Sequence, residues 1–364
     1  KVKNYHDSLQ IITEGYNSLL NGKWKYMMSL KQNYEGSSSY FMLPLMEESY
    51  TPVGAPKLAL QAESEIAAIN MVLGAASAGV RAMTSSSSPG ISLKCEGISY
   101  IAGSDLPCVI VNCMRGGPGL GTIQPAQGDY FQATRGGGNG DYRTVVLAPA
   151  NIQELVDFIQ EAFDIADCYR NPVLVLADGL TGQMMEPIEW HEIPHRELPP
   201  KDWATTGKHG RSHPNFVTSL SIDPNDCNEM NQRLARKYAL ITEKEIRYEA
   251  KDCEDAEVVL VAYGTPARVV LSAIEELRRQ GVKAGLFRPI TLWPFPEKQL
   301  HDLAGEDHVK VVLDVEMSLG QMIDDVRLAV EGQKPVKFAG CAGGRISPLG
   351  EVVGGVDNAL NEGG

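Results

Sequence analysis

The stretch Pro107–Gly121, with the sequence PCVIVNCMRGGPGLG, decides the fold. Its first part, Pro107–Asn112, is a short apolar run, and the rest is a loop that holds four glycines. A continuous apolar run of this length is typical of a strand that is buried on both faces of a parallel sheet. Ligands bind outside the carboxyl ends of such strands. The stretch therefore predicts a central strand whose carboxyl end carries a site.

The surrounding sequence, residues 58–178, alternates runs typical of helices and of strands. The segment Glu63–Ala76 is rich in helix formers and small apolar residues, which predicts a buried helix that opens near Glu65. An amphipathic helix is predicted over Asn151–Ala166 and another strand over Pro172–Leu176. This alternation is that of a doubly wound parallel sheet.

The second half of the chain contains another α/β unit. Between residues 187 and 250 the sequence lacks clear periodicity, which indicates a long connection with at most one helix, near Asn228–Leu240. Strands are then predicted over Glu257–Gly264, Val282–Phe287 and Val309–Val315, with an amphipathic helix after the first of them. A second, smaller parallel sheet is expected.

Length and composition fit two domains. The 364 residues, 43% of them hydrophobic and 22% charged, are enough to bury the cores of two domains. We expect the first domain over residues 1–190, an inter-domain linker over 191–252 and the second domain over 253–364. A net charge of −13 argues against nucleic acid or an anionic membrane as partner. Without an apolar run of about 18 residues or a leading apolar segment, we expect a cytoplasmic location.

Cysteine and histidine give no signature of a metal site. The seven cysteines include no Cys-x-x-Cys pair, so they are interpreted as reduced structural thiols. The seven histidines are scattered without the spacing of a zinc motif. No metal ligand is therefore expected in this chain.

Arg115 is the first candidate for chemistry. It follows the predicted central strand and precedes the glycines, so its guanidinium could face a space that the backbone lets a ligand approach. Arginine suits a planar carboxylate because its fork donates two parallel hydrogen bonds. The alternative from the local pattern is that Arg115 pairs with a nearby acid and the glycines only form a turn.

Two further features each allow two interpretations. The turn Ser85–Gly90 could hold an anion with its hydroxyls and free amides, or it could be an ordinary helix cap. Glu65 has apolar neighbours, so its carboxyl should be partly desolvated and in need of a specific hydrogen-bonding partner. Alternatively, Glu65 is a helix-start carboxylate that the helix dipole favours.

Several long blocks, taken together and in order, resemble the α-type subunit of the 2-oxoacid:ferredoxin oxidoreductases, most closely the branched-chain (3-methyl-2-oxobutanoate, or 2-ketoisovalerate) members. The resemblance runs from about Leu58 to Ile346. The blocks are QAESEIAAIN (61–70), TSSSSPGIS (84–92), MRGGPGLG (114–121), GDYFQAT (128–134), Asp178-Gly179, LFRPITLWPFP (286–296) and EMSLGQ (316–321).

The resemblance implies an α/β fold with a pyrimidine-type thiamine-diphosphate-binding domain, followed by a domain like the carboxyl-terminal domain of transketolase. It also implies that Glu65 hydrogen-bonds the aminopyrimidine ring of thiamine diphosphate and thereby assists deprotonation of the thiazolium carbon. Cofactor contacts are also expected from Ser86, Ser87, Pro89 and Gly90.

For Arg115, the resemblance implies that it receives the carboxylate of the 2-oxo acid, beside Gly116 and Gly117. The implied reaction is coenzyme A-dependent oxidative decarboxylation of a branched-chain 2-oxo acid, with reduction of ferredoxin. The exact 2-oxo acid does not follow from the sequence.

The chain lacks several parts of such an enzyme. The Gly-Asp-Gly motif for magnesium and diphosphate is absent, since Ala177-Asp178-Gly179 is not followed by the paired asparagines. The resemblance therefore implies that a β subunit supplies Mg²⁺ and shares the thiamine diphosphate. It also implies a γ subunit, a ferredoxin-like δ subunit that holds iron-sulfur clusters, and external ferredoxin. Alone, the chain should be inactive.

One stretch departs from the family. Residues 1–57 align poorly, and Met46 stands where the family has a threonine that contacts substrate. A methionine cannot donate that hydrogen bond, so Ser49 substitutes for it, or the contact is lost, or this region has an unusual sequence. Two alternatives to the oxidoreductase subunit stay open: a component of a non-redox thiamine diphosphate enzyme, similar to transketolase or a decarboxylase, and a catalytically silent scaffold subunit.

Overall fold

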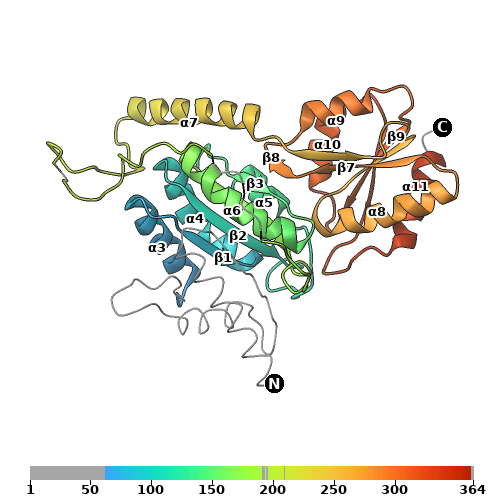
Figure 1. Cartoon of the computed structure of the whole chain (residues 1–364), viewed down its shortest axis with the longest axis horizontal. Helices are drawn as coiled ribbons and strands as arrows, with labels where there is room; N and C mark the ends of the chain where they lie inside the picture. The colour runs from blue at the N-terminus through green and yellow to red at the C-terminus, as the bar shows by residue number, and fades with distance from the viewer. Residues whose placement is uncertain (1–61, 191–192, 194–195, 209, 362–364) are drawn as a thin grey trace, which may run out of the picture.

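The computed structural model describes residues 62–190, 193, 196–208 and 210–361, which form two five-stranded sheets with helices on both faces (Figure 1). Met46 and Ser49 lie outside these residues. The first group of elements is α3 (Glu65–Ser77), β1 (Met83–Ser86), α4 (Ser88–Gly103), β2 (Cys108–Met114), α5 (Tyr130–Arg135), β3 (Val145–Leu147), α6 (Ile152–Tyr169), β4 (Pro172–Asp178) and α7 (Pro224–Lys244). The second group is β5 (Tyr248–Lys251), β6 (Val258–Val261), α8 (Gly264–Arg279), β7 (Ala284–Pro289), β8 (Thr291–Trp293), α9 (Glu297–Ala304), β9 (Val311–Glu316), α10 (Met322–Val330), β10 (Val336–Gly340) and α11 (Leu349–Asn361).

The first sheet has the order β1-β2-β4-β3-β8, and β1, β2, β4 and β3 run parallel. Strand β2 is buried on both faces, as predicted: Val109 and Val111 pack with α6 and α7, and Ile110 packs with α3 and α4. Asn151 caps α6 because its side chain accepts the Glu154 amide. The predicted doubly wound arrangement is confirmed.

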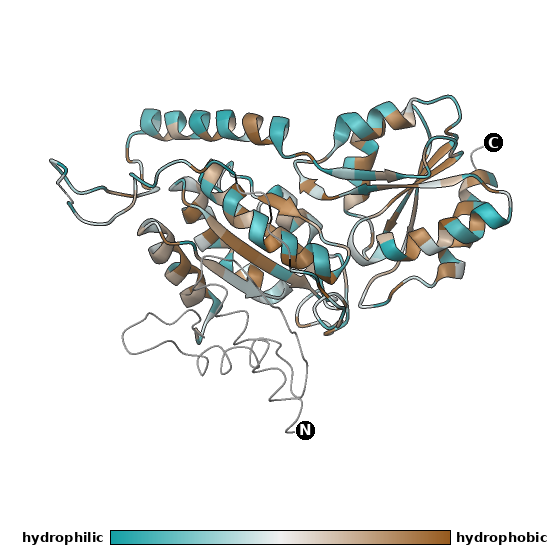
Figure 2. Cartoon of the chain, viewed as in Figure 1, coloured by the Kyte–Doolittle hydropathy of each residue, from teal (hydrophilic) through white to brown (hydrophobic). Residues whose placement is uncertain are grey.

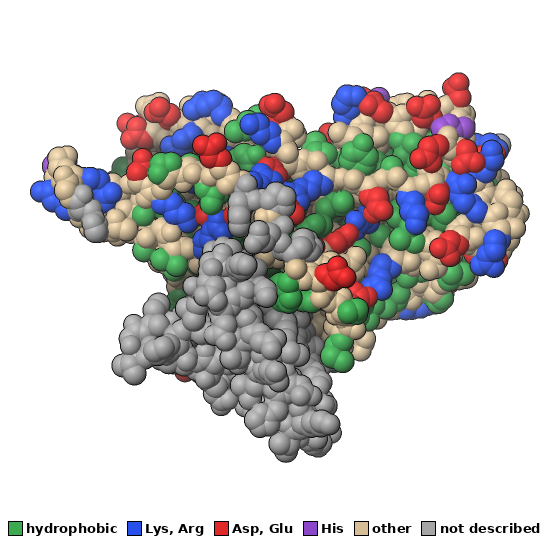
Figure 3. Space-filling view, in the orientation of Figure 1, with side chains coloured by type: hydrophobic (Ala, Val, Ile, Leu, Met, Phe, Trp, Pro, Cys, Tyr) green, Lys and Arg blue, Asp and Glu red, His purple; other side chains and the backbone are tan. Residues whose placement is uncertain are grey.

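The second sheet has the order β10-β9-β6-β7-β5, with only β5 antiparallel. Helices α8 and α11 cover one face, and α9 and α10 cover the other. Figure 2 shows the strands of both sheets as mainly hydrophobic, with hydrophilic residues on the outer sides of the helices. On the face drawn in Figure 3, acidic and basic side chains are interspersed over this half of the molecule.

The segment that connects the two predicted domains is more ordered than its sequence indicates. Its one predicted helix is α7, which is longer than the expected Asn228–Leu240, and Leu234 and Ile241 join the core of the first sheet. The sequence did not predict β5, which pairs with β7 and makes the end of this segment part of the second sheet.

Strand β8 joins the two halves. It follows β7 in the second half of the chain, yet it pairs with β3 at the edge of the first sheet. One hydrophobic cluster also runs through both sheets, from Ile110 in β2 to Val259 in β6. The two sheets are therefore held together by main-chain pairing and by a shared core.

Helices α3 and α4 approach closely because α4 has glycines on the facing side. A Cβ at Gly97 would lie 2.5 Å from Cγ2 of Ile69, and one at Gly90 would lie 3.1 Å from Oε1 of Glu65. Ile69 and Glu65 are one helical turn apart, so the two glycines face the same side of α3.

Among the described helices, none is long and apolar enough to cross a membrane.

The tight contact at Gly97 predicts that Gly97→Ala will destabilise the chain by about 1–3 kcal/mol, because the β-branched Ile69 must shift to admit a methyl group. Gly354→Ala in α11 is the matched control: no described atom lies within 4 Å of the added Cβ, so the usual helical preference for alanine should make it neutral or stabilising. Urea denaturation measures both. Equal effects of the two substitutions would contradict the packing described for α3 and α4.

Candidate active site

The candidate site lies where parallel strands end together. In the register of the first sheet, Ser86 is opposite Asn112, and Met114 is opposite Asp178. The Ser-rich segment, the Arg115 loop and the Asp178 turn therefore leave the same edge of the sheet, where ligand sites form in such folds.

Glu65 lies beside the Ser-rich segment. It is the first residue of α3 and is partly exposed, and a Cβ at Gly90 would lie 2.0 Å from Oγ of Ser86 as well as 3.1 Å from Glu65. Any other residue at position 90 would therefore collide with Ser86, and glycine lets α4 begin close to the Ser86 and Glu65 side chains. No hydrogen bond or ion pair within the described residues engages the Glu65 carboxylate, which leaves it free for a ligand.

The Ser-rich segment is divided between a strand and a helix. Ser85 and Ser86 end β1, and Ser88, Pro89 and Gly90 form the first turn of α4. Ser87 occupies the N-cap position, but its side chain makes no capping hydrogen bond. Ser87 therefore has the position of a helix cap without its side-chain hydrogen bond.

Ser88 instead anchors the Arg115 loop. Its hydroxyl donates to Oδ2 of Asp129 at 2.6 Å and accepts the amide of Arg115 at 3.1 Å. Asn112, buried in β2, donates to the same Asp129 oxygen at 2.9 Å. Three segments of the family-like sequence thus meet around one carboxylate.

Arg115 has a free side chain. Its Nε is buried without a hydrogen-bonding partner, and no carboxylate among residues 62–190, 193, 196–208 and 210–361 forms an ion pair with the guanidinium. The alternative that Arg115 pairs with a nearby acid is therefore not supported by the described chain. Leaving a buried donor unpaired costs about 1–3 kcal/mol, so a bound anion that accepts a hydrogen bond from Nε would remove this cost.

The glycines after Arg115 let the loop fold back on itself. Gly116 donates to Gln124 and accepts from Thr122, and Gly121 has φ +52°, with its Cα so near Gly116 that a side chain would collide with the Gly116 carbonyl. A Cβ at Gly116 would also lie 2.8 Å from the amide nitrogen of Gly344, in the second half of the chain. Gly117 is exposed beside it. The second half therefore supports the Arg115 loop from behind.

Lys94 is a buried lysine that the sequence analysis missed. It lies on α4, one turn after Gly90, is 1% exposed, and donates to Oγ1 of Thr84 at 2.8 Å. Burial lowers the pKa of Lys94, while attraction to Glu65 opposes the change. Its position in the sequence could have indicated its burial. Lys94 lies between Gly90 and Gly97 on one face of the helix, and a charged residue on a packed face needs a specific partner or environment.

Asp178 does not behave as a metal ligand. Its Oδ1 accepts the amides of Leu180 and Thr181, so the carboxylate stabilises its own turn. Within the described part of the chain, no group of three or more His, Cys, Asp or Glu side chains could hold a metal ion.

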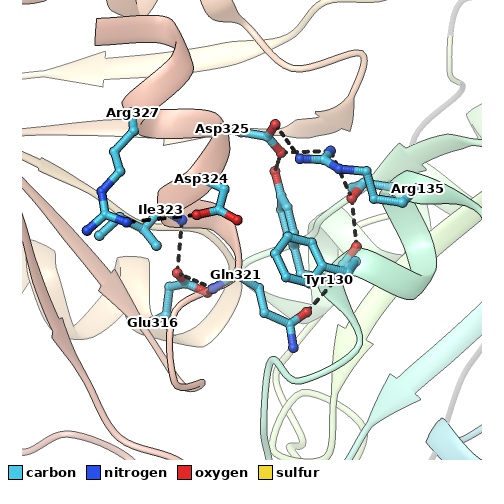
Figure 4. A network of polar contacts seen from close by, with 10 residues as sticks. Tyr130, Arg135, Glu316, Gln321, Ile323, Asp324, Asp325 and Arg327 are labelled. Carbon is cyan, nitrogen blue, oxygen red and sulfur yellow. Dashed lines mark hydrogen bonds and ion pairs between the residues drawn. The ribbon is translucent and has the colours of Figure 1, made fainter. Parts of the chain in front are cut away.

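Polar contacts tie the two halves together next to this edge (Figure 4). The buried Tyr130 hydroxyl donates to Oδ2 of Asp325 at 2.5 Å, and Arg135 pairs with both oxygens of the same carboxylate. Gln321 accepts the Phe131 amide at 2.9 Å. These contacts fix α5, which follows the Arg115 loop, against the start of α10.

Glu316 and Asp314 are buried carboxyl groups at the end of β9. Glu316 accepts the amides of Gln321 and Ile323 at the start of α10 (Figure 4). Asp314, two residues earlier, has no donor for either oxygen, and burial raises its pKa well above the usual value, with the negative charge of Glu316 adding to the rise. A protonated Asp314 avoids placing a second buried negative charge beside Glu316.

Two family models match the chain in sequence. Residues 39–255 match the thiamine-diphosphate-binding domain of pyruvate flavodoxin/ferredoxin oxidoreductase, and residues 256–352 match core domain II of pyruvate:ferredoxin oxidoreductase. Ketoisovalerate oxidoreductase subunit VorB of Methanothermobacter thermautotrophicus is 48% identical over 328 residues, which are 88% of this chain and 92% of that protein. 2-Oxoglutarate synthase subunit KorA of Methanocaldococcus jannaschii is 35% identical over 79% of this chain and 83% of its own length.

Solved structures share the fold. The 2-oxoglutarate:ferredoxin oxidoreductase from Magnetococcus marinus, with 2-oxoglutarate, coenzyme A and succinyl-CoA bound, superposes with a TM-score of 0.71 at 25% identity. The match covers 83% of this chain and 57% of that one. A split gene transketolase superposes with a TM-score of 0.51 at 16% identity, over 82% of both chains, and shows likeness of fold alone. The predicted fold class is confirmed.

The raised pKa of Asp314 predicts a pH-dependent effect of Asp314→Asn. The unfolded chain ionises this group near pH 4 while the folded chain keeps it protonated, so wild-type stability falls as pH rises above that value. The amide removes this loss, so the variant should be more stable than wild type at pH 7, with the difference shrinking towards pH 4. Denaturation of the purified chain across this range measures the difference. Asp357→Asn on the exposed side of α11 is the control for the charge change; the same pH profile in both variants would contradict the prediction.

Proposed function

The chain belongs to the 2-oxoacid:ferredoxin oxidoreductase family, and from this premise we propose that it is the subunit that receives the 2-oxo acid and the pyrimidine end of thiamine diphosphate. The reaction is the coenzyme A-dependent oxidative decarboxylation of a branched-chain 2-oxo acid to acyl-CoA and CO₂, with reduction of ferredoxin. The free Arg115 guanidinium, with its buried unpaired Nε, is the observation that carries the proposal.

Arg115 fits the carboxylate of the substrate. A planar carboxylate at the guanidinium would accept two charge-assisted hydrogen bonds and give Nε the partner that it lacks. The Ser88–Asp129 contact holds the Arg115 backbone, the packed Gly116 lets the loop fold against it, and the exposed Gly117 leaves space beside it. These residues would orient the 2-oxo acid, which is the main protein contribution to such a reaction.

Glu65 and the Ser-rich segment fit the pyrimidine end of the cofactor. Thiamine diphosphate, when bound, supplies the nucleophilic carbon that attacks the keto group. Glu65 has a carboxylate without a partner in the described chain, and Gly90 lets the Glu65 and Ser86 side chains lie close together. We assign Glu65 to the ring nitrogen, and Ser86, Ser87, Pro89 and Gly90 to the wall that the ring contacts.

The other cofactors are assigned to partner chains. Oδ1 of Asp178 accepts two amides of its own turn, and no group of three or more metal-ligating side chains occurs among the described residues, so that part of the chain offers the diphosphate and its Mg²⁺ no site of the expected kind. We propose a β subunit for Mg²⁺ and diphosphate, a γ subunit, and a ferredoxin-like δ subunit for the iron-sulfur clusters. The names of the relatives, subunits VorB and KorA, fit a multi-subunit complex.

The domain division is proposed as 1–190, 191–252 and 253–364. The two family models meet at residues 255 and 256, close to the end of the proposed linker. Ser49 stays a candidate substrate contact in the atypical segment 1–57, which the structure does not describe.

The branched-chain substrate rests on the higher identity to the ketoisovalerate subunit, 48%, than to the 2-oxoglutarate subunit, 35%. We expect the purified complex to turn over 3-methyl-2-oxobutanoate with a higher kcat/KM than pyruvate, 2-oxoglutarate or indolepyruvate. Reduction of a viologen dye in the presence of coenzyme A measures all four. A preference for 2-oxoglutarate would overturn the substrate assignment and leave the family unchanged.

Arg115→Ala in the assembled complex should raise KM for the 2-oxo acid by about 10- to 100-fold, because a hydrogen-bonded contact to a charged group contributes about 1.5–3 kcal/mol. KM for coenzyme A should stay near the wild-type value, since the substitution deletes only the carboxylate contact.

Arg143→Ala is the matched control. Arg143 is an arginine of the same domain that bonds backbone carbonyls near the end of α5, away from the Arg115 loop. It should leave both constants unchanged. Equal increases for the 2-oxo acid and coenzyme A in Arg115→Ala would sink the assignment of Arg115.

A further inference from the structure

We propose that Lys94 is a positioning residue for Glu65: its buried ammonium attracts the Glu65 carboxylate and holds it toward the cofactor ring. This inference rests on the proposed function of Glu65. Lys94 does not contact the cofactor in this scheme, because its Nζ is directed at β1 through Thr84 and Ser85.

The packing of α3 on α4 places the two charges. Gly90, Lys94 and Gly97 follow one another at intervals of three or four residues and so share one face of α4. The outer two contact Glu65 and Ile69 of α3. Lys94 therefore lies on the face of α4 that meets α3, between two points where the helices almost touch.

The surroundings of Lys94 hold one compensating charge. From α3 the charged group is Glu65, whose attraction raises the pKa of Lys94 against the effect of burial. From β1 the groups are uncharged, the Thr84 hydroxyl at 2.8 Å and the Ser85 carbonyl at 3.4 Å. No described carboxylate comes within ion-pair distance of Nζ. Burial of an ammonium without a directly paired anion is costly. Among the described residues, Glu65 is the negative charge whose attraction offsets part of this cost.

A charge in this position would act on the orientation of Glu65. At a partly buried site the attraction between opposite charges is stronger than in water, so it restrains a side chain that otherwise has three rotatable bonds. Without Lys94, the Glu65 carboxylate has no partner in the described chain and could turn toward solvent. The restrained carboxylate would keep its hydrogen bond to the ring nitrogen and so support removal of the proton from the thiazolium carbon.

A simpler role for Lys94 would be to tie β1 to α4 through Thr84. The two roles depend on different properties of the side chain. Lys94→Gln removes the charge and keeps a hydrogen-bond donor for Thr84, whereas Lys94→Met removes both. Thr84→Val keeps the charge and removes the tie.

The test uses the complex assembled with its partner subunits and loaded with thiamine diphosphate. Hydrogen–deuterium exchange at the thiazolium carbon, followed by NMR after acid quench, reports Glu65 without substrate, coenzyme A or ferredoxin. Glu65→Gln should slow exchange by about 10²-fold or more. Lys94→Met and Lys94→Gln should each slow it about tenfold, the size expected for loss of one attractive charge, and Thr84→Val should leave it near wild type.

Lys237→Met is the matched control. Lys237 is another largely buried lysine, on helix α7 against the first sheet, and it pairs with Asp105 at 2.6 Å. It should lower the midpoint of thermal unfolding and leave exchange unchanged. Thermal unfolding of every variant separates a loss of fold from a loss of function.

The outcomes are distinct. Wild-type exchange in Lys94→Gln, or slow exchange in Thr84→Val, would show that Lys94 only ties β1 to α4 and would overturn the proposal. Failure of both Lys94 variants to assemble would overturn it too, because the side chain would then hold the fold. If Glu65→Gln itself exchanges at the wild-type rate, the proposed function of Glu65 fails instead.

Discussion

The candidate site depends on the close approach of α3 and α4. Gly97 admits Ile69 at a distance that no Cβ would allow, and Gly90 does the same for Glu65. The carboxylate is thereby brought to the end of β1, where the Ser-rich segment begins, and Lys94 becomes enclosed between the helices. A larger residue at either glycine would move α3 away and displace the carboxylate from the strand ends on which the rest of the site is built.

The other side of the site depends on the second half of the chain. Ser88, which is bonded to Asp129, holds the Arg115 end of the loop by a hydrogen bond to the Arg115 amide. At Gly116 the loop lies against Gly343 and Gly344 of the second half of the chain. The Tyr130–Asp325 contact fixes the helix that follows the loop. Arg115 can remain unpaired because its backbone is fixed from several directions, and an unpaired guanidinium is the state that a carboxylate ligand requires.

Many of these strands and helices can be predicted from local sequence patterns. The apolar run before Arg115 predicts β2, and the helix and strand periods predict α6, β4 and most of the second sheet. Lys94 escaped because a single lysine in a helix usually points to solvent, and only packing against α3 buries it. Strands β5 and β8 were not predicted because they are short and pair with strands that are distant in the sequence. The free state of Arg115 is likewise a property of three-dimensional neighbours, which a local pattern cannot contain.

Because β8 crosses from the second half to the first sheet, the two halves cannot be produced as separate proteins with both sheets complete. A cut at residues 255 and 256, where the family models meet, would remove β8 from the fragment that contains β3. That fragment would expose the edge of β3, with unpaired main-chain groups ready to recruit strands from other molecules. Gene fission at the apparent domain boundary is therefore disfavoured in this chain.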